Sequence, residues 1–258
     1  MIRSAFAIFC AMVSIAPLSA QEAITLPGRD GLTLKAKLYR PAGSGPFPAI
    51  VALHGCGGPW QPRDDDWGHR LAGAGFLVVF TDSFGSRGLG SQCRIKERTI
   101  RPRQRAEDAF ATAEWLATRS DVNSNRIGLL GWSNGGSTVL SAARRGRGPK
   151  GVEFRQTVAF YPGCRVYAEA GNYRTRMPVT ILHGLADNWT LAEPCKALPG
   201  VRFVGFEGAY HDFDHPDLPL RQRKAALTPE GGGTVTVGTH PEARAGAIRE
   251  VMTIFGGM

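Results

Sequence analysis

Hydrophobic positions along the chain follow two different periods. Short, nearly all-apolar runs recur at intervals, as is typical of parallel strands that are covered on both faces. Segments with apolar residues at helical spacing lie between several of these runs. This alternation predicts an α/β fold with a mostly parallel central sheet and helices on both faces. The strands expected are residues 32–39, 49–53, 76–80, 127–130, 157–161, 179–182 and 201–206.

Three helices show boundary signals. The segment after Pro102 has its apolar residues on one face, and proline is favoured in a first helical turn, so we expect this helix to pack on the sheet. A shorter helix is expected to end at Gly75. The final helix is expected to begin with a capping box, because Glu242 follows Thr239 by three residues.

Residues 214–238 fit no long element. The stretch is polar and contains three prolines and three successive glycines. Long irregular segments in compact domains are often functional. We therefore expect an excursion that forms a flap near the site.

The first twenty residues predict a secretory signal peptide. Arg3 precedes an apolar run that is too short to cross a bilayer, and small residues precede the polar pair Gln21-Glu22. We expect cleavage after Ala20 and a protein that is exported to the periplasm or secreted. The mature chain, residues 21–258, is expected to form a single domain without an integral membrane segment.

The chain is basic, with 31 Lys and Arg against 22 Asp and Glu and a net charge of +9. The charge gathers in residues 94–105, 144–150 and 221–224. Such clusters can attract an anionic substrate or an envelope surface, but we favour solvated faces as their interpretation. They lack interleaved aromatic residues and a known module signature, which argues against nucleic acid as a partner.

The strongest chemical signal is the sequence Gly-Trp-Ser-Asn-Gly at residues 131–135. It follows the strand 127–130 and opens a helical run, the setting in which a nucleophile occupies a tight strand-to-helix turn. The flanking glycines are required because a Cβ there would meet neighbouring backbone. A helix N-terminus behind Ser133 adds positive potential for an oxyanion. Ser133 is the predicted nucleophile.

A serine nucleophile needs a base and an acid, which follow it in the order acid, then histidine. Asp187 comes shortly after the strand 179–182, and His211 follows the strand 201–206. These two residues complete the predicted triad. His215 is the alternative base, but it is further from the strand end and is followed by Pro216.

Two acidic residues and two histidines between 211 and 215 could suggest a metal site. Their spacing matches no familiar ligand set, and a metal would compete for the triad histidine. We expect no metal and no cofactor.

The oxyanion hole requires two backbone N–H groups. Asn134, directly after the nucleophile, supplies one. The strand 49–53 leads into His-Gly-Cys-Gly-Gly at residues 54–58, whose backbone can turn an N–H inward. Cys56 is the expected second donor.

Taken together, these motifs resemble the dienelactone hydrolase family of the α/β-hydrolases over almost all of the mature chain. They comprise residues 54–58, Asp82-Ser83-Phe84 with Arg87-Gly88, residues 131–136, Asp187, and Tyr-His-Asp-Phe at 210–213. The resemblance implies a sheet of about eight strands and hydrolysis of an ester or lactone without a cofactor. Ser133 replaces the cysteine of that family, and Gly55 stands where it has a gating glutamate. Both departures favour a general serine esterase of the same fold.

The resemblance also suggests a role for Arg87. Arginines near the site of that family hold a substrate carboxylate, and a guanidinium can do so with two parallel hydrogen bonds. Arg87, in the loop after the strand 76–80, is the candidate here. In the alternative it pairs with Asp82 or a backbone carbonyl and fixes the loop.

Four cysteines remain once Cys10 leaves with the signal peptide. An even number in an exported chain predicts two disulfides, and the sequence alone leaves three pairings open. The implied fold brings the loops together in the pairs Cys56–Cys93 and Cys164–Cys195, which is the pairing we expect.

The sequence thus predicts an exported serine hydrolase that cleaves a small-molecule carboxylic ester or lactone through an acyl-enzyme on Ser133. A peptidase or an acyltransferase with the same triad remains an alternative, because these enzymes differ only in the bond that is cleaved and in the group that accepts the acyl group. A binding module without catalysis would be expected to have a broken triad, and here every part is present.

Overall fold

Eight strands form the central sheet of the computed structural model, which describes residues 21–149 and 151–258. The predicted signal peptide lies outside the described residues. Every strand expected from the sequence is present with shifted ends, and β1 is an additional one. The strands are β1 (Gln21–Pro27), β2 (Thr33–Tyr39), β3 (Phe47–Leu53), β4 (Leu77–Asp82), β5 (Val122–Trp132), β6 (Thr157–Phe160), β7 (Val179–Gly184) and β8 (Arg202–Phe206).

The sheet has the order β1-β2-β4-β3-β5-β6-β7-β8. β2 pairs antiparallel with β1 and β4, and the remaining neighbours are parallel. Because β3 to β8 run in one direction, the loops after them meet at one edge, where sites of such sheets form. This is the α/β-hydrolase fold expected from the sequence.

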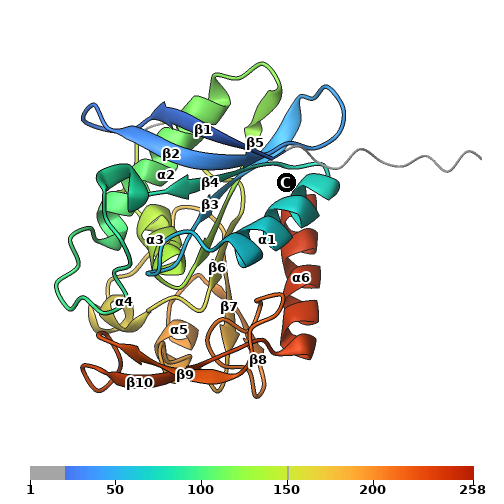
Figure 1. The fold of residues 1–258 in the computed structure, drawn as a ribbon. Coiled ribbons are helices and arrows are strands. Elements are labelled where there is room, and N and C mark those ends of the chain that lie inside the picture. The colour runs from blue at the N-terminus through green and yellow to red at the C-terminus, as the bar shows by residue number, and fades with distance from the viewer. Residues whose placement is uncertain (1–20, 150) are drawn as a thin grey trace, which may run out of the picture.

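Helices cover both faces of the sheet. α1 (Gln61–Gly73) and α6 (Pro241–Gly256) lie on one face, and α2 (Pro102–Ala117) and α3 (Asn134–Ala143) lie on the other (Figure 1). The short helices α4 (Arg165–Glu169) and α5 (Glu193–Lys196) and the 3-10 turn η1 (Gly85–Arg87) occupy loops. Pro102 stands in the first turn of α2, as predicted.

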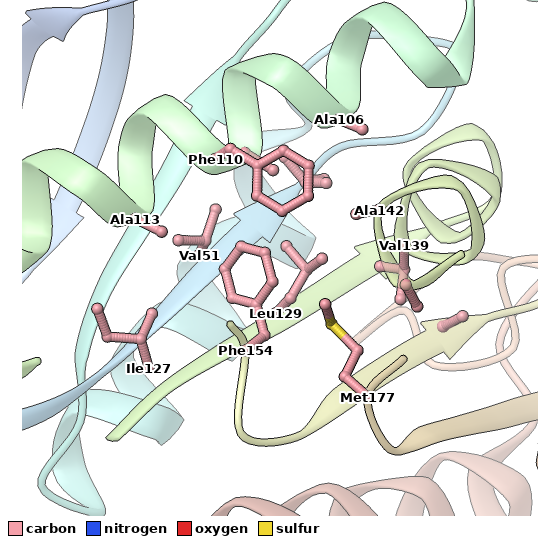
Figure 2. Packing of buried hydrophobic residues seen from close by; sticks show 14 of the residues in the cluster. Val51, Ala106, Phe110, Ala113, Ile127, Leu129, Val139, Ala142, Phe154 and Met177 are labelled. Carbon is pink, nitrogen blue, oxygen red and sulfur yellow. The ribbon is translucent and has the colours of Figure 1, made fainter. Parts of the chain in front are cut away.

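Two hydrophobic layers hold these helices to the sheet. On one face, the rings of Phe110 and Phe154 stack with centroids 5.8 Å apart beside Val51 and Leu129 (Figure 2). On the other, Trp67 and its apolar neighbours pack between the sheet, α1 and α6. A fully buried side chain of this size contributes about 1.5–3 kcal/mol, so both layers fix the sheet edge that carries the site.

The excursion at residues 214–238 contains a hairpin. β9 (Arg221–Ala225) pairs antiparallel with β10 (Gly233–Val237), and the two form a separate sheet near α5 (Figure 1). Val235 and Val237 bury against Trp189, which anchors the hairpin beside the loop after β7. No helix in residues 21–149 or 151–258 is long and apolar enough to span a bilayer.

The predicted capping box of the last helix was wrong. His240 is the N-cap of α6, and its Nδ1 accepts a hydrogen bond from the N–H of Ala243. The hydroxyl of Thr239 instead donates to the carbonyl of His215 and accepts from the N–H of Leu218. Thr239 therefore ties the excursion to the helix start.

Candidate active site

Ser133 occupies the turn between β5 and α3 with φ 54° and ψ −111°. A positive φ at a non-glycine residue is unfavourable and persists only where the surroundings enforce it. The backbone around this turn leaves no room for a side chain at either flanking glycine. A Cβ at Gly131 would collide with the carbonyl of Gly135, and a Cβ at Gly135 would collide with the carbonyl of Leu53. The strained turn and its glycines match the geometry predicted for a nucleophile elbow.

His211 and Asp187 form a buried pair at the same sheet edge. His211 Nδ1 lies 2.7 Å from Asp187 Oδ2, and both side chains are at most 1% exposed. The other carboxylate oxygen accepts the N–H groups of Trp189 at 2.8 Å and Thr190 at 3.0 Å. These bonds fix Asp187, and Asp187 in turn orients the imidazole.

The pair shifts both titrations. Burial lowers the pKa of His211, but the charge and hydrogen bond of Asp187 outweigh it and raise that pKa above the usual value. Burial likewise raises the pKa of Asp187, and His211 outweighs it, so that pKa is lowered. Asp187 is therefore ionised at neutral pH. His211 Nε2 has no hydrogen-bond partner among the described residues, which leaves it available to a substrate or nucleophile.

Contacts at the end of β6 connect Ser133 to His211. The N–H of Ser133 donates to the carbonyl of Phe160 at 2.9 Å. The next residue, Tyr161, packs its ring 4.3 Å from that of His211. Ser133 and the His211–Asp187 pair therefore lie on either side of the end of β6.

Other histidines have different surroundings. His215, the alternative base, packs its ring 4.1 Å from Trp60, and burial lowers its pKa. Burial also lowers the pKa of His54 and of His183. Among His54, His183, His211 and His215, only His211 is hydrogen-bonded to Asp187.

Asp214 has a buried structural role. Its carboxylate accepts hydrogen bonds from Trp67 and Trp132 on one oxygen and from Tyr161 on the other, at 2.6–2.8 Å. No group of three or more His, Cys, Asp or Glu within the described residues is arranged to hold a metal.

The loop after β3, in which the sequence predicts an oxyanion donor, lies directly against Ser133. A Cβ at Gly55 would be 3.6 Å from the Cβ of Ser133. Cys56 is bonded to Cys93, and its carbonyl accepts the N–H of Gln92 at 2.7 Å. Asn134 begins α3, where the first N–H groups lack helical acceptors. Gly55 therefore lies against Ser133, with Cys56 next to Gly55 and Asn134 next to Ser133 along the chain.

Both expected disulfides are present, Cys56–Cys93 and Cys164–Cys195. The first joins the loop after β3 to the segment before α2. The second joins the loop after β6 to α5. Both pairings agree with those implied by the fold.

Arg105 was missed by the sequence analysis. This buried side chain donates to the side-chain oxygen of Asn134 at 2.5 Å and to the carbonyl of His54 at 2.8 Å. It links the start of α3 to the loop after β3, and burial lowers its pKa to about 9. In sequence, Arg105 looked like one member of a solvated cluster, and only its place on the inner face of α2 distinguishes it.

The side chain of Arg87 is bound to other residues of the protein. Its guanidinium makes two hydrogen bonds of 2.8 and 2.9 Å to the buried carboxylate of Asp108, and a third to the carbonyl of Ser83. It is not among the residues that line the cavity at Ser133. This geometry favours the structural alternative, with Asp108 as the acid in place of Asp82.

A cavity of about 610 Å³ opens above Ser133 and Asn134. Its walls come from the start of α2, the end of α3, α4, the loop after β7 and the tip of the β9–β10 hairpin. The hairpin contributes Leu227, Thr228 and Pro229. The excursion thus borders the site, where a flap was expected.

Comparison with known proteins places the chain in a family. The model of the X-Pro dipeptidyl-peptidase (S15) family matches residues 30–158, which is half of the chain. The chain belongs to the S15 family. The matched part contains Ser133 and the loop after β3, and it ends before Asp187 and His211. The protein is a serine hydrolase of the α/β class.

The curated relatives that this chain matches are longer proteins. One is the "Probable dipeptidyl-aminopeptidase B" of Neosartorya fischeri, 29% identical over 197 residues. That match covers 72% of this chain but 21% of the relative, so the chain spans about a fifth of the relative's length.

Solved structures share the fold. A candidate dienelactone hydrolase from Klebsiella pneumoniae has a TM-score of 0.73 at 17% identity, covering 93% of this chain and 99% of that one. A dienelactone hydrolase from Anabaena variabilis has a TM-score of 0.64 at 18% identity, covering 93% and 98%. The fold is therefore that of the family which the motifs resemble.

Proposed function

We propose that the protein hydrolyses a small-molecule carboxylic ester or lactone through an acyl-enzyme on Ser133. The observation that carries this proposal is the strained backbone of Ser133 in the lining of a cavity, at the sheet edge that also carries the buried Asp187–His211 pair. A serine held in this way exposes its hydroxyl to a bound carbonyl, and a neutral imidazole nearby can take its proton.

The reaction follows from this arrangement. Ser133 Oγ attacks the carbonyl carbon while its proton moves to His211 Nε2, and the resulting imidazolium is stabilised by Asp187. The N–H groups of Cys56 and Asn134 bind the oxyanion. His211 then protonates the leaving alcohol. A water, deprotonated by His211, attacks the acyl-enzyme and releases the acid and Ser133.

Peptide hydrolysis is the second candidate, and the family match favours it. The names of the family and of its relatives refer to removal of dipeptides, an activity in which the substrate carries a free amino terminus. A protonated amine inside a cavity calls for an anionic partner. Within the described residues, the lining of this cavity contains no Asp or Glu. We therefore place the ester first.

A matched substrate pair tests the choice. The purified protein is assayed with an N-acyl-amino acid 4-nitrophenyl ester, the corresponding 4-nitroanilide and an aminoacyl-proline 4-nitroanilide with a free amino terminus, as the dipeptidyl substrate, alongside Ser133→Ala. We expect ester turnover that disappears in Ser133→Ala. Faster turnover of the dipeptidyl substrate than of the ester would establish the peptidase instead, and ester turnover by Ser133→Ala would exclude Ser133 as nucleophile.

We further propose that the mature protein begins at Gln21 and is exported. Support comes from the residues before this position and from the two disulfides, which persist in oxidising compartments. Cell fractionation with N-terminal sequencing tests this proposal. A cytoplasmic protein that retains Met1 would contradict it.

A further inference from the structure

Arginine dominates the polar lining of the cavity at Ser133. The arginines come from two sides, one around the start of α2 and the other from the end of α3 and from α4. No acidic side chain lines the cavity within the part of the chain that the structure describes. The arginines are Arg98, Arg101, Arg103, Arg144, Arg147 and Arg165.

Five of these six arginines form no ion pair with a described residue, whereas several arginines outside the cavity do. Elsewhere, Arg63 pairs with Asp64 at 2.6 Å and Arg244 with Asp66 at 2.6 Å. In the cavity, one weak ion pair is formed with a described residue, between Arg165 and Glu169 at 3.9 Å. Both of its side chains are more than half exposed, where such pairs contribute little.

Arg98 carries the least favourable charge of the set. Its Nε is buried and has no hydrogen-bond partner among the described residues, and burial lowers its pKa. A desolvated guanidinium without a counterion is unstable relative to one in water. Like charges converging on one cavity add repulsion. An anion in the cavity would relieve both costs.

The cavity mouth also carries exposed hydrophobic side chains. Val166 is 74% exposed, Leu191 45% and Leu227 41%, and all three line this cavity. They are three of the five large hydrophobic residues that the described surface exposes. Anionic and apolar groups in one ligand would fit such a wall.

We propose that the substrate is a polyanionic ester, with two or more carboxylate or phosphate groups on an apolar body beside the scissile carbonyl. One oxyanionic group is held by one or two guanidiniums, and the arginines approach from two separate elements, so two groups suit the site better than one. This substrate class rests on the proposed esterase function. The arginines that would bind these anionic groups include neither Arg87 nor a residue of the triad.

Three esters that differ mainly in charge test this substrate class. They are 4-nitrophenyl butyrate, mono-4-nitrophenyl glutarate and mono-4-nitrophenyl tricarballylate, which carry zero, one and two free carboxylates. We expect kcat/KM to rise at least tenfold with each charge and this gain to shrink in 0.5 M salt, since salt screens exposed charges. Equal rates on all three esters would overturn the proposal.

Single variants locate the effect. Arg98→Gln and Arg147→Gln, one from each side, should each lower kcat/KM for the dianionic ester about tenfold, which corresponds to about 1.4 kcal/mol. The loss on the butyrate, which carries no carboxylate, should be clearly smaller for both variants. The matched control is Arg249→Gln, which removes the same charge from an exposed site on α6. An equal effect of all three variants would reduce the preference to net charge and refute a built site.

Binding to Ser133→Ala separates this proposal from the function on which it rests. Calorimetry with tricarballylate and with pyrophosphate should show binding that Arg98→Gln weakens, and the tighter probe identifies the oxyanion. If no ester is turned over but this binding is found, the esterase function fails and the anion site stands. If neutral esters are hydrolysed and neither probe binds, the esterase function stands and the anion site is wrong.

Discussion

Replacing Asp187 by Asn tests how the base is oriented. The carboxylate accepts four hydrogen bonds, two on each oxygen: Oδ1 binds backbone N–H groups, and Oδ2 binds His211 Nδ1 and the hydroxyl of Thr190. An asparagine oxygen at the Oδ1 position preserves both backbone bonds. Its NH2 group then faces His211 Nδ1, which must become an acceptor. The ring proton moves to Nε2, so His211 can no longer accept the proton of Ser133.

This tautomer change sets the magnitude. Loss of the base in a serine triad of this kind lowers kcat by about 10⁴, or about 5.5 kcal/mol. Asp187 also holds the pKa of His211 up, so Asp187→Asn should move the rising limb of the pH profile to lower pH. Stability should fall far less than activity, because the loop keeps its backbone bonds.

The assay is kcat/KM on 4-nitrophenyl acetate from pH 5 to 9, with a melting curve for each variant. Asp212→Asn is the matched control: it removes a charge next to His211, forms no hydrogen bond with His211 in the structure, and keeps a residue type that tolerates its φ of 62°. We expect less than about a tenfold loss there. A nearly silent Asp187→Asn beside a crippled Asp212→Asn would show that the acid has been misassigned.

Three further outcomes follow. Activity should rise with pH through the titration of His211, because the protonated ring cannot accept the proton of Ser133. The midpoint of this rise should lie above the ordinary histidine pKa of about 6.5. A flat kcat/KM profile from pH 5 to 9 would contradict this prediction. Arg87→Leu leaves the buried Asp108 unpaired, so it should lower the free energy of unfolding by about 3 kcal/mol and Tm by about 6–12 °C. Its effect on kcat/KM should be the same for neutral and carboxylate esters. A loss of kcat/KM confined to the carboxylate ester would show that Arg87 binds the substrate. Thiol titration of the unfolded mature protein should find no free cysteine before reduction and four after it, and Cys164→Ser with Cys195→Ser should cost about 2–4 kcal/mol; four thiols before reduction would refute both bridges.

The strands that could be predicted are those with a strong apolar signal. β3, β7 and the second half of β5 are buried on both faces, so their sequences are mostly hydrophobic. β9 reads Arg-Gln-Arg-Lys-Ala and has no such pattern. It is held as a strand by its pairing with β10, which no local property of the sequence reveals.

In the site, too, some residues could be placed from the sequence and others could not. The placement of Ser133, Asp187 and His211 at one sheet edge could be predicted because each stands shortly after a strand, and parallel strands bring such positions together. The partner of Arg87 could not be foreseen, since Asp108 lies 21 residues away on α2. The arginines of the cavity were visible as clusters, but their convergence on Ser133 depends on how α2, α3 and α4 pack.

The central claim is that Ser133 is an activated nucleophile, and covalent labelling tests it most directly. The mature protein is treated with a fluorophosphonate, digested and mapped by mass spectrometry, with Ser133→Ala as the control and a melting curve to verify its fold. We predict a single adduct on the peptide that carries Ser133, faster labelling above the pKa of His211, and no adduct in Ser133→Ala. An adduct that persists in folded Ser133→Ala, or a parent protein that resists labelling throughout this pH range, would contradict the account.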